Sequence, residues 1–126
     1  MTQLKFLLID DNPIDLMVNE RLLQNAFNDC SVTSFSNALE ALEFLKDNRG
    51  NAHLLPQVIL LDLIMPRLDG FQIVDELEKT YSVLPFKVFL LSATMNEADF
   101  SNANENKWVE SILNKPLEIE VLKNLI

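Results

Sequence analysis

The sequence has few of the residues that mark several classes of protein. It has two glycines and one cysteine in 126 residues, which argues against a fibrous or disordered chain and excludes an internal disulfide. No apolar run is long enough to cross a membrane. Ten basic residues against 19 acidic ones give a net charge of −9, which repels nucleic acid and anionic lipid. We therefore expect a cytoplasmic protein whose partners are neither nucleic acids nor membranes.

Apolar residues make up 48% of the chain, and they occur in two patterns that alternate along it: short continuous runs and helical spacing. Short apolar runs, typical of buried parallel strands, occupy 4–9, 32–35, 58–61, 88–91 and 109–113. Helical spacing follows each run, over 13–28, about 38–45, 71–81, 96–104 and 117–126. Five strands alternating with five helices predict an α/β fold, a doubly wound parallel sheet with helices on both faces. We expect one domain over residues 1–126.

The first predicted helix has a clear start. Asn12 and Pro13 are typical of a helix N-cap and a first helical residue. Ile14, Met17 and Val18 then recur with helical spacing, so we expect them on the apolar face of an amphipathic helix.

Acids, a hydroxyl and a lysine follow the predicted strands. Asp10 and Asp11 come after the first strand, Asp62 after the third, Ser92 after the fourth and Lys115 after the fifth. Because the carboxyl ends of parallel strands share one edge of a sheet, we expect these side chains to lie together. Any one of them alone could be a helix cap or a surface charge.

Such a cluster favours a cation. Neighbouring carboxylates repel by about 4 kcal/mol per pair at about 4 Å and an effective dielectric near 20, and a bound hard cation removes that cost. Carboxylates with carbonyl and water ligands suit Mg²⁺. Lys115 and Ser92 could hold an anion across the cation, as phosphoryl transfer requires. Asp62, on the central strand, is then the candidate nucleophile that would form an aspartyl phosphate.

These motifs resemble the receiver domains of two-component response regulators. The segment 62–70, DLIMPRLDG, is similar to the phosphoacceptor loop of that family. The other matching motifs, in order along the chain, are Asp10-Asp11, Leu91-Ser92-Ala93 and Lys115-Pro116. The resemblance covers essentially the whole chain and implies a flavodoxin-like receiver fold with strand order 2-1-3-4-5.

The resemblance also implies a role for each residue of the cluster. Asp62 would accept phosphate from a phosphohistidine on a sensor histidine kinase or a histidine phosphotransfer protein. The implied Mg²⁺ site consists of Asp10 (mainly through water), Asp11, Asp62 and the backbone carbonyl of Ile64. Ser92 and Lys115 would hold the phosphoryl oxygens, and the Lys115-Pro116 peptide bond would be cis.

Three further positions bear on phosphate lifetime and switching. Ile64 and Thr94 stand where members of the family tune access of the hydrolytic water. Ile112 stands where the family commonly has Tyr or Phe, so the aromatic half of the family's switch lacks its usual side chain here. Trp108 lies at the start of the predicted fifth strand, four residues too early to replace it by position.

The expected function is a stand-alone receiver, monomeric or weakly dimeric, whose output is a conformational change read by a downstream protein through residues 96–126. We do not expect an enzyme in the metabolic sense. One alternative is a small Mg²⁺-dependent phosphohydrolase, although it would usually need an acid where this chain has Ile64, and a capping element. Another is a degenerate receiver that only binds proteins, against which the complete set of acids, serine and lysine argues. A flavodoxin is disfavoured because no Ser/Thr/Gly-rich loop follows the first strand.

Overall fold

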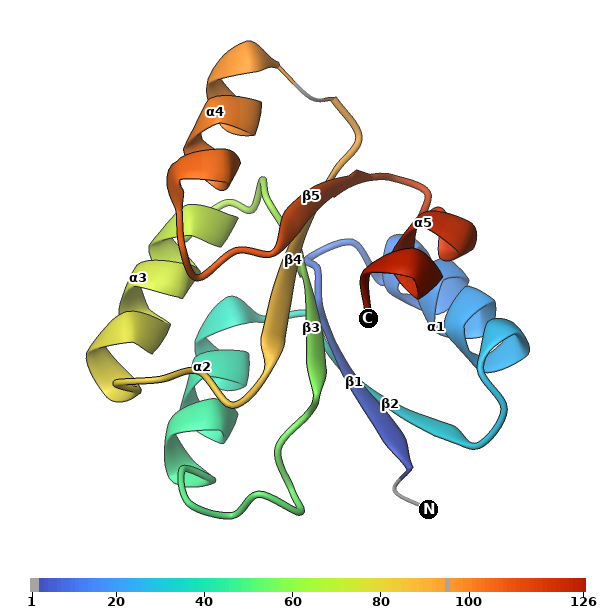
Figure 1. The fold of residues 1–126 in the computed structure, drawn as a ribbon, viewed down its shortest axis with the longest axis horizontal. Helices are drawn as coiled ribbons and strands as arrows, with labels where there is room; N and C mark the ends of the chain where they lie inside the picture. Colours follow the sequence, from blue (N-terminus) through green and yellow to red (C-terminus); the bar gives the residue numbers. More distant parts are fainter. Residues whose placement is uncertain (1–2, 95) are drawn as a thin grey trace.

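Five parallel strands form one sheet in the computed structural model, which describes residues 3–94 and 96–126 (Figure 1). The strands are β1 (Leu4–Ile9), β2 (Cys30–Phe35), β3 (Val58–Asp62), β4 (Lys87–Ser92) and β5 (Ser111–Asn114). They lie in the order β2-β1-β3-β4-β5, and every neighbouring pair is parallel. All five residues of β3 are buried, because this strand is central and covered on both faces. The predicted fold class and strand order are confirmed.

Helices cover both faces of the sheet. They are α1 (Pro13–Ala26), α2 (Ala38–Asp47), α3 (Gly70–Thr80), α4 (Glu97–Glu105) and α5 (Ile119–Leu125). Figure 1 shows α1 and α5 on one side of the sheet and α2, α3 and α4 on the other. Successive strand residues therefore enter two separate cores: Leu7 and Ile9 pack on the α2–α3 side, and Phe6 and Leu8 on the α1–α5 side.

The helices that follow β1 and β3 begin at well-made caps. The Asn12 side chain accepts hydrogen bonds from the backbone N–H groups of Ile14 and Asp15, at 2.9 and 3.3 Å, and Pro13 begins α1. Asp69 and Gln72 form a reciprocal capping box at the start of α3. Each cap fixes the residue at which its helix begins. It therefore also fixes the end of the loop that leads from the strand to that helix, at the edge of the sheet where the acids lie.

The predicted apolar face of the first helix is wrong. Ile14, Met17 and Val18 are all exposed, whereas the buried residues of α1 are Leu16, Asn19 and Leu23. Both sets of residues have helical spacing, and the buried set contains the polar residue Asn19. Periodicity of apolar residues therefore favoured the exposed face of the helix over the buried one. The start of the helix, which Asn12 caps, and the packing of Leu16 and Leu23 in the α1–α5 core set its actual rotation.

The boundaries of several elements also differ from the prediction by a few residues. The first helix ends at Ala26 rather than near 28, and the last begins at Ile119 rather than 117. The fifth strand begins at Ser111 rather than 109, so Trp108 precedes the strand in a turn. Within the described ranges 3–94 and 96–126, no helix combines the length and apolar character needed to span a membrane.

Candidate functional site

The acids that follow β1 and β3 meet at the carboxyl edge of the sheet. Ile9 of β1 pairs with Leu61 of β3, which places the residues after them side by side. One carboxylate oxygen from each of Asp10, Asp11 and Asp62 lies within 4.8 Å of the others. Asp10 and Asp62 are buried, with 2% and 6% exposure, while Asp11 is open to solvent. Two buried acids and one exposed acid thus converge from two strand ends, as the sequence predicted.

Lys115, after β5, crosses the same edge and reaches three carboxylates. Its Nζ lies 2.7 Å from Oδ2 of Asp10, 3.2 Å from Oδ1 of Asp62 and 3.1 Å from Oδ2 of Asp15. Its backbone N–H donates to the carbonyl of Ser92 on the neighbouring strand at 3.0 Å. The Lys115-Pro116 peptide bond is cis, in agreement with the expectation. The lysine side chain is only 12% exposed, so its charge is compensated almost entirely by these acids.

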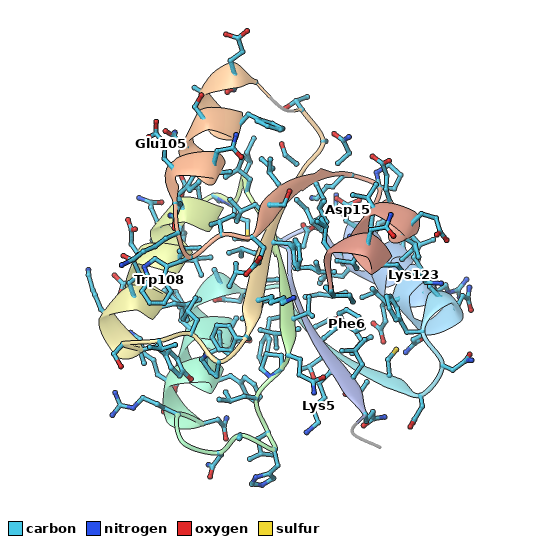
Figure 2. The ribbon with its side chains drawn as sticks, viewed as in Figure 1. Lys5, Phe6, Asp15, Glu105, Trp108 and Lys123 are labelled. Atoms are coloured by element: carbon cyan, nitrogen blue, oxygen red, sulfur yellow. The ribbon has the colours of Figure 1, made fainter. Side chains whose placement is uncertain are left out.

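Sequence reasoning missed Asp15. This residue lies in the first turn of α1, and Figure 2 shows it at the end of the helix that borders the β5–α5 loop. Its side chain is 39% exposed, and its carboxylate pairs with a lysine 100 positions further along the chain. The sequence shows only that Asp15 lies three residues after the N-cap Asn12. An acid at that position is common, because it interacts favourably with the helix dipole, so it does not by itself indicate a contact with Lys115.

The two oxygens of Asp10 have different surroundings. Oδ1 accepts a hydrogen bond from the backbone N–H of Asn12 at 2.9 Å. Oδ2 is fully buried and, among the described residues, has no hydrogen-bond partner beyond its ion pair with Lys115. This buried oxygen and the two further carboxylates form a donor set that fits a hard divalent cation such as Mg²⁺.

Burial and neighbouring charges together set the pKa values of Asp62 and Lys115. Burial, together with the charge of Asp10, raises the pKa of Asp62 from 3.8 to about 6, although Lys115 and the N–H of Ile64 oppose the rise. Burial disfavours the Lys115 ammonium, but its contacts with Asp10 and Asp15 and the charge of Asp62 outweigh burial and raise its pKa. Lys115 therefore stays charged at neutral pH, and in the absence of a cation the Asp62 carboxylate is held at an energetic cost.

The other predicted site residues differ in their exposure to solvent and in their hydrogen bonds. Ser92 is buried at the end of β4, and its hydroxyl donates to the carbonyl of Thr94 at 2.5 Å. Ile64 has a 64% exposed side chain, and its N–H donates to Oδ1 of Asp62 at 3.3 Å. Thr94 is exposed, whereas Ile112 is buried in the α2–α3 core, away from solvent.

The family follows from a comparison with known proteins. The profile described as "Response regulator receiver domain" matches residues 6–126, and the chain therefore belongs to this family. Receiver domains are the modules of two-component systems that take phosphoryl groups from histidine kinases or phosphotransfer proteins, and in general they bind Mg²⁺.

Solved structures agree with this assignment. A response regulator receiver protein from Dyadobacter fermentans is 30% identical, with a TM-score of 0.86 over 97% of this chain and 94% of its own. A two-component response regulator from Cytophaga hutchinsonii is 25% identical, with a TM-score of 0.90 over 99% and 95%.

Curated relatives are often longer than this chain. A probable methanogenesis regulatory protein, FilR2 of Methanothrix harundinacea, is 28% identical over 95% of this chain and 77% of its own length. The response regulator MprA of a Mycobacterium species is 31% identical over 94% of this chain, which spans only 46% of that relative.

Proposed function

We propose that this chain is a phosphoacceptor receiver domain over residues 1–126, in which Asp62 takes a phosphoryl group from a phosphohistidine in a Mg²⁺-dependent step. The observation that carries the proposal is the contact between the Lys115 ammonium and the Asp62 carboxylate, 3.2 Å apart, beside the acidic cluster of Asp10, Asp11 and Asp62. A cation site and an anion-binding lysine on the two sides of one carboxylate are the parts that phosphoryl transfer needs.

The transfer step would use a free oxygen of Asp62. Its Oδ1 already accepts from Ile64 and contacts Lys115, so Oδ2 is the oxygen better placed to attack. As the new O–P bond forms, the P–N bond of the phosphohistidine breaks, and the electron pair returns to the imidazole nitrogen, which takes a proton from solvent. The product is an aspartyl phosphate and a neutral histidine.

The remaining residues of the cluster would stabilise charge. Asp10, Asp11, Asp62 and the backbone carbonyl of Ile64 would hold Mg²⁺, which neutralises charge on the transferring phosphoryl group when bound. Lys115 would move its ammonium from Asp62 Oδ1 to a phosphoryl oxygen. Ser92 would have to release the carbonyl of Thr94 before its hydroxyl could donate to the phosphate.

The same proposal covers the wider behaviour of the chain. The phosphodonor is a sensor histidine kinase or a histidine phosphotransfer protein in the cytoplasm, and output is a change of contacts with a downstream protein through residues 96–126. The chain acts as a monomer or weak dimer and is not an enzyme in the metabolic sense. Ile112, buried in the α2–α3 core, takes no part as an aromatic switch.

Phosphorylation by a small donor tests the proposal directly. The protein is incubated with acetyl phosphate and Mg²⁺, and its intact mass is measured. We expect the wild type to gain one phosphate, Asp62→Asn to gain none, and Asp75→Asn, an exposed acid on α3, to behave like the wild type. A wild type that gains no phosphate would favour a degenerate receiver, and rapid turnover of phosphomonoesters would favour the phosphohydrolase.

A further inference from the structure

Asp15 differs from the other two acids that hold Lys115. Asp10 and Asp62 both belong to the cluster whose oxygens lie within 4.8 Å of one another and fit a cation, while Asp15 stands outside that cluster. Asp15 belongs to the first turn of α1, and its Oδ2 lies 3.1 Å from the Lys115 Nζ. Of the three carboxylates within reach of the ammonium, it is the one that a cation in the cluster does not engage.

The distances show why this difference matters. Lys115 Nζ is 2.7 and 3.2 Å from the carboxylates of Asp10 and Asp62. A divalent cation that binds these same carboxylates takes up their negative charge and repels the ammonium at short range. The two contacts that now hold Lys115 therefore weaken when the cation binds, whereas the 3.1 Å contact with Asp15 remains.

The surroundings of Lys115 leave room for this shift. A cavity of about 340 Å³ lies between α1 and the segments that follow β4 and β5, and it is lined by Asp15, Val18, Asn19, Ala93, Lys115 and Pro116. The lysine side chain can therefore turn toward Asp15 without displacing the core. The backbone N–H of Asp15 donates to the Asn12 cap at 3.3 Å, so the backbone from which this carboxylate extends is fixed at the start of a 14-residue helix.

We propose that Asp15 is a positioning residue that keeps the Lys115 ammonium at the edge of the site when the cation is bound, ready to take a phosphoryl oxygen. The inference rests on the proposed function, because it concerns the state in which cation and phosphoryl group share the site. It adds a fourth acid, contributed by α1, to the three of the cluster. A plain helix-start role for Asp15 would affect the stability of α1 but not the behaviour of Lys115.

The first measurement follows the lysine itself. In protein labelled with ¹⁵N-lysine, the Lys115 ammonium signal is identified by its absence from Lys115→Ala. We expect the wild type to keep this signal with and without Mg²⁺. Asp15→Asn should keep it without Mg²⁺, because Asp10 and Asp62 still hold the ammonium, and should lose it when Mg²⁺ is added. A signal that survives Mg²⁺ in Asp15→Asn would overturn the inference.

The second measurement is the affinity for beryllofluoride, a phosphoryl mimic, by calorimetry at saturating Mg²⁺. We expect Asp15→Asn to raise the dissociation constant by about threefold to tenfold, as for one charge-assisted contact to a half-exposed acid. Asp15→Glu, which keeps the charge, should restore part of the affinity. The matched control Asp75→Asn carries the same charge change on α3 and should bind like the wild type.

A double-mutant cycle assigns the effect to Lys115. In a Lys115→Ala background, Asp15→Asn should have no further effect on the dissociation constant. An effect of Asp15→Asn that persists in the Lys115→Ala background would overturn the role of Asp15. An affinity of the single variant Asp15→Asn that equals or exceeds that of the wild type would do the same. Either result would leave the proposed function intact. A wild type that does not bind the mimic with Mg²⁺ would instead sink the proposed function, and the inference with it.

Discussion

Replacing Asp62, the proposed phosphoacceptor, by asparagine, its neutral isostere, should stabilise the folded protein when no divalent cation is present. The pKa of Asp62 is about 6 in the folded protein against an ordinary value of 3.8, because the carboxyl is buried beside Asp10. At about 1.36 kcal/mol for each pKa unit, the charged form of Asp62 costs the folded state about 3 kcal/mol at pH 7. The side chain is only 8% exposed, so solvent screens little of this cost.

Asparagine removes the charge and keeps the shape. Its side-chain oxygen can still accept from Lys115 and from the N–H of Ile64, so part of the local network survives. We expect Asp62→Asn to raise the free energy of unfolding by about 1 to 3 kcal/mol at pH 7 in EDTA, less than the full cost because Lys115 loses a charged partner.

The pH dependence of this gain has a definite sign. Between pH 3.8 and about 6, the folded wild type binds more protons at Asp62 than the unfolded chain does, so its stability falls as the pH rises through this window. The advantage of Asp62→Asn should therefore shrink below about 1 kcal/mol at pH 4, where Asp62 is protonated in the folded state.

Urea unfolding followed by circular dichroism measures both quantities, with Asp75→Asn as the control for a change in net charge. Saturating Mg²⁺ should reduce the difference in unfolding free energy between Asp62→Asn and the wild type at pH 7, because a ligand that binds the folded wild type stabilises it. An Asp62→Asn protein no more stable than the wild type at pH 7, or one whose advantage is the same at pH 4, would refute the reasoning.

Two further predictions concern the loop that carries Asp62. Gly70→Ala should destabilise the fold by about 1 to 3 kcal/mol, because the added Cβ would lie 2.8 Å from Leu90 Cδ2 and 3.2 Å from the Leu63 Cα; thermal or urea unfolding measures this, and an unchanged stability would show that the loop yields freely. Ile64→Asn should shorten the lifetime of the proposed aspartyl phosphate, because the apolar side chain two residues after Asp62, which would shield the acyl phosphate from water, gives way to one that can orient water. The decay of the phosphorylated mass measures this lifetime, and an equal lifetime in the variant would show that Ile64 does not shield the phosphate.

Much of the fold and of the acidic cluster could be read from the sequence. Apolar runs of strand length, each followed by helical spacing, leave a parallel sheet as the arrangement that buries them. Parallel strands then bring their carboxyl ends to one edge, so acids after two of these runs had to approach each other. The sequence alone therefore predicts that Asp10, Asp11 and Asp62 lie together.

Other features depended on how elements pack against one another. The sequence does not predict the rotation of α1, because the exposed residues Ile14, Met17 and Val18 have helical spacing just as the buried residues of this helix do. The direction of the Ser92 hydroxyl, toward the carbonyl of Thr94, follows from the local path of the chain after β4 rather than from residue type.

Residue order alone predicts the five strands, the acids that follow the first and third of them, and the lysine that follows the last. The contact between Lys115 and Asp15, an acid 100 positions earlier on α1, arises from the packing of that helix against the sheet. The physical reason is that local patterns specify elements and their period, whereas a contact between distant side chains depends on the rotation and placement of whole elements, which the packing of both cores sets together.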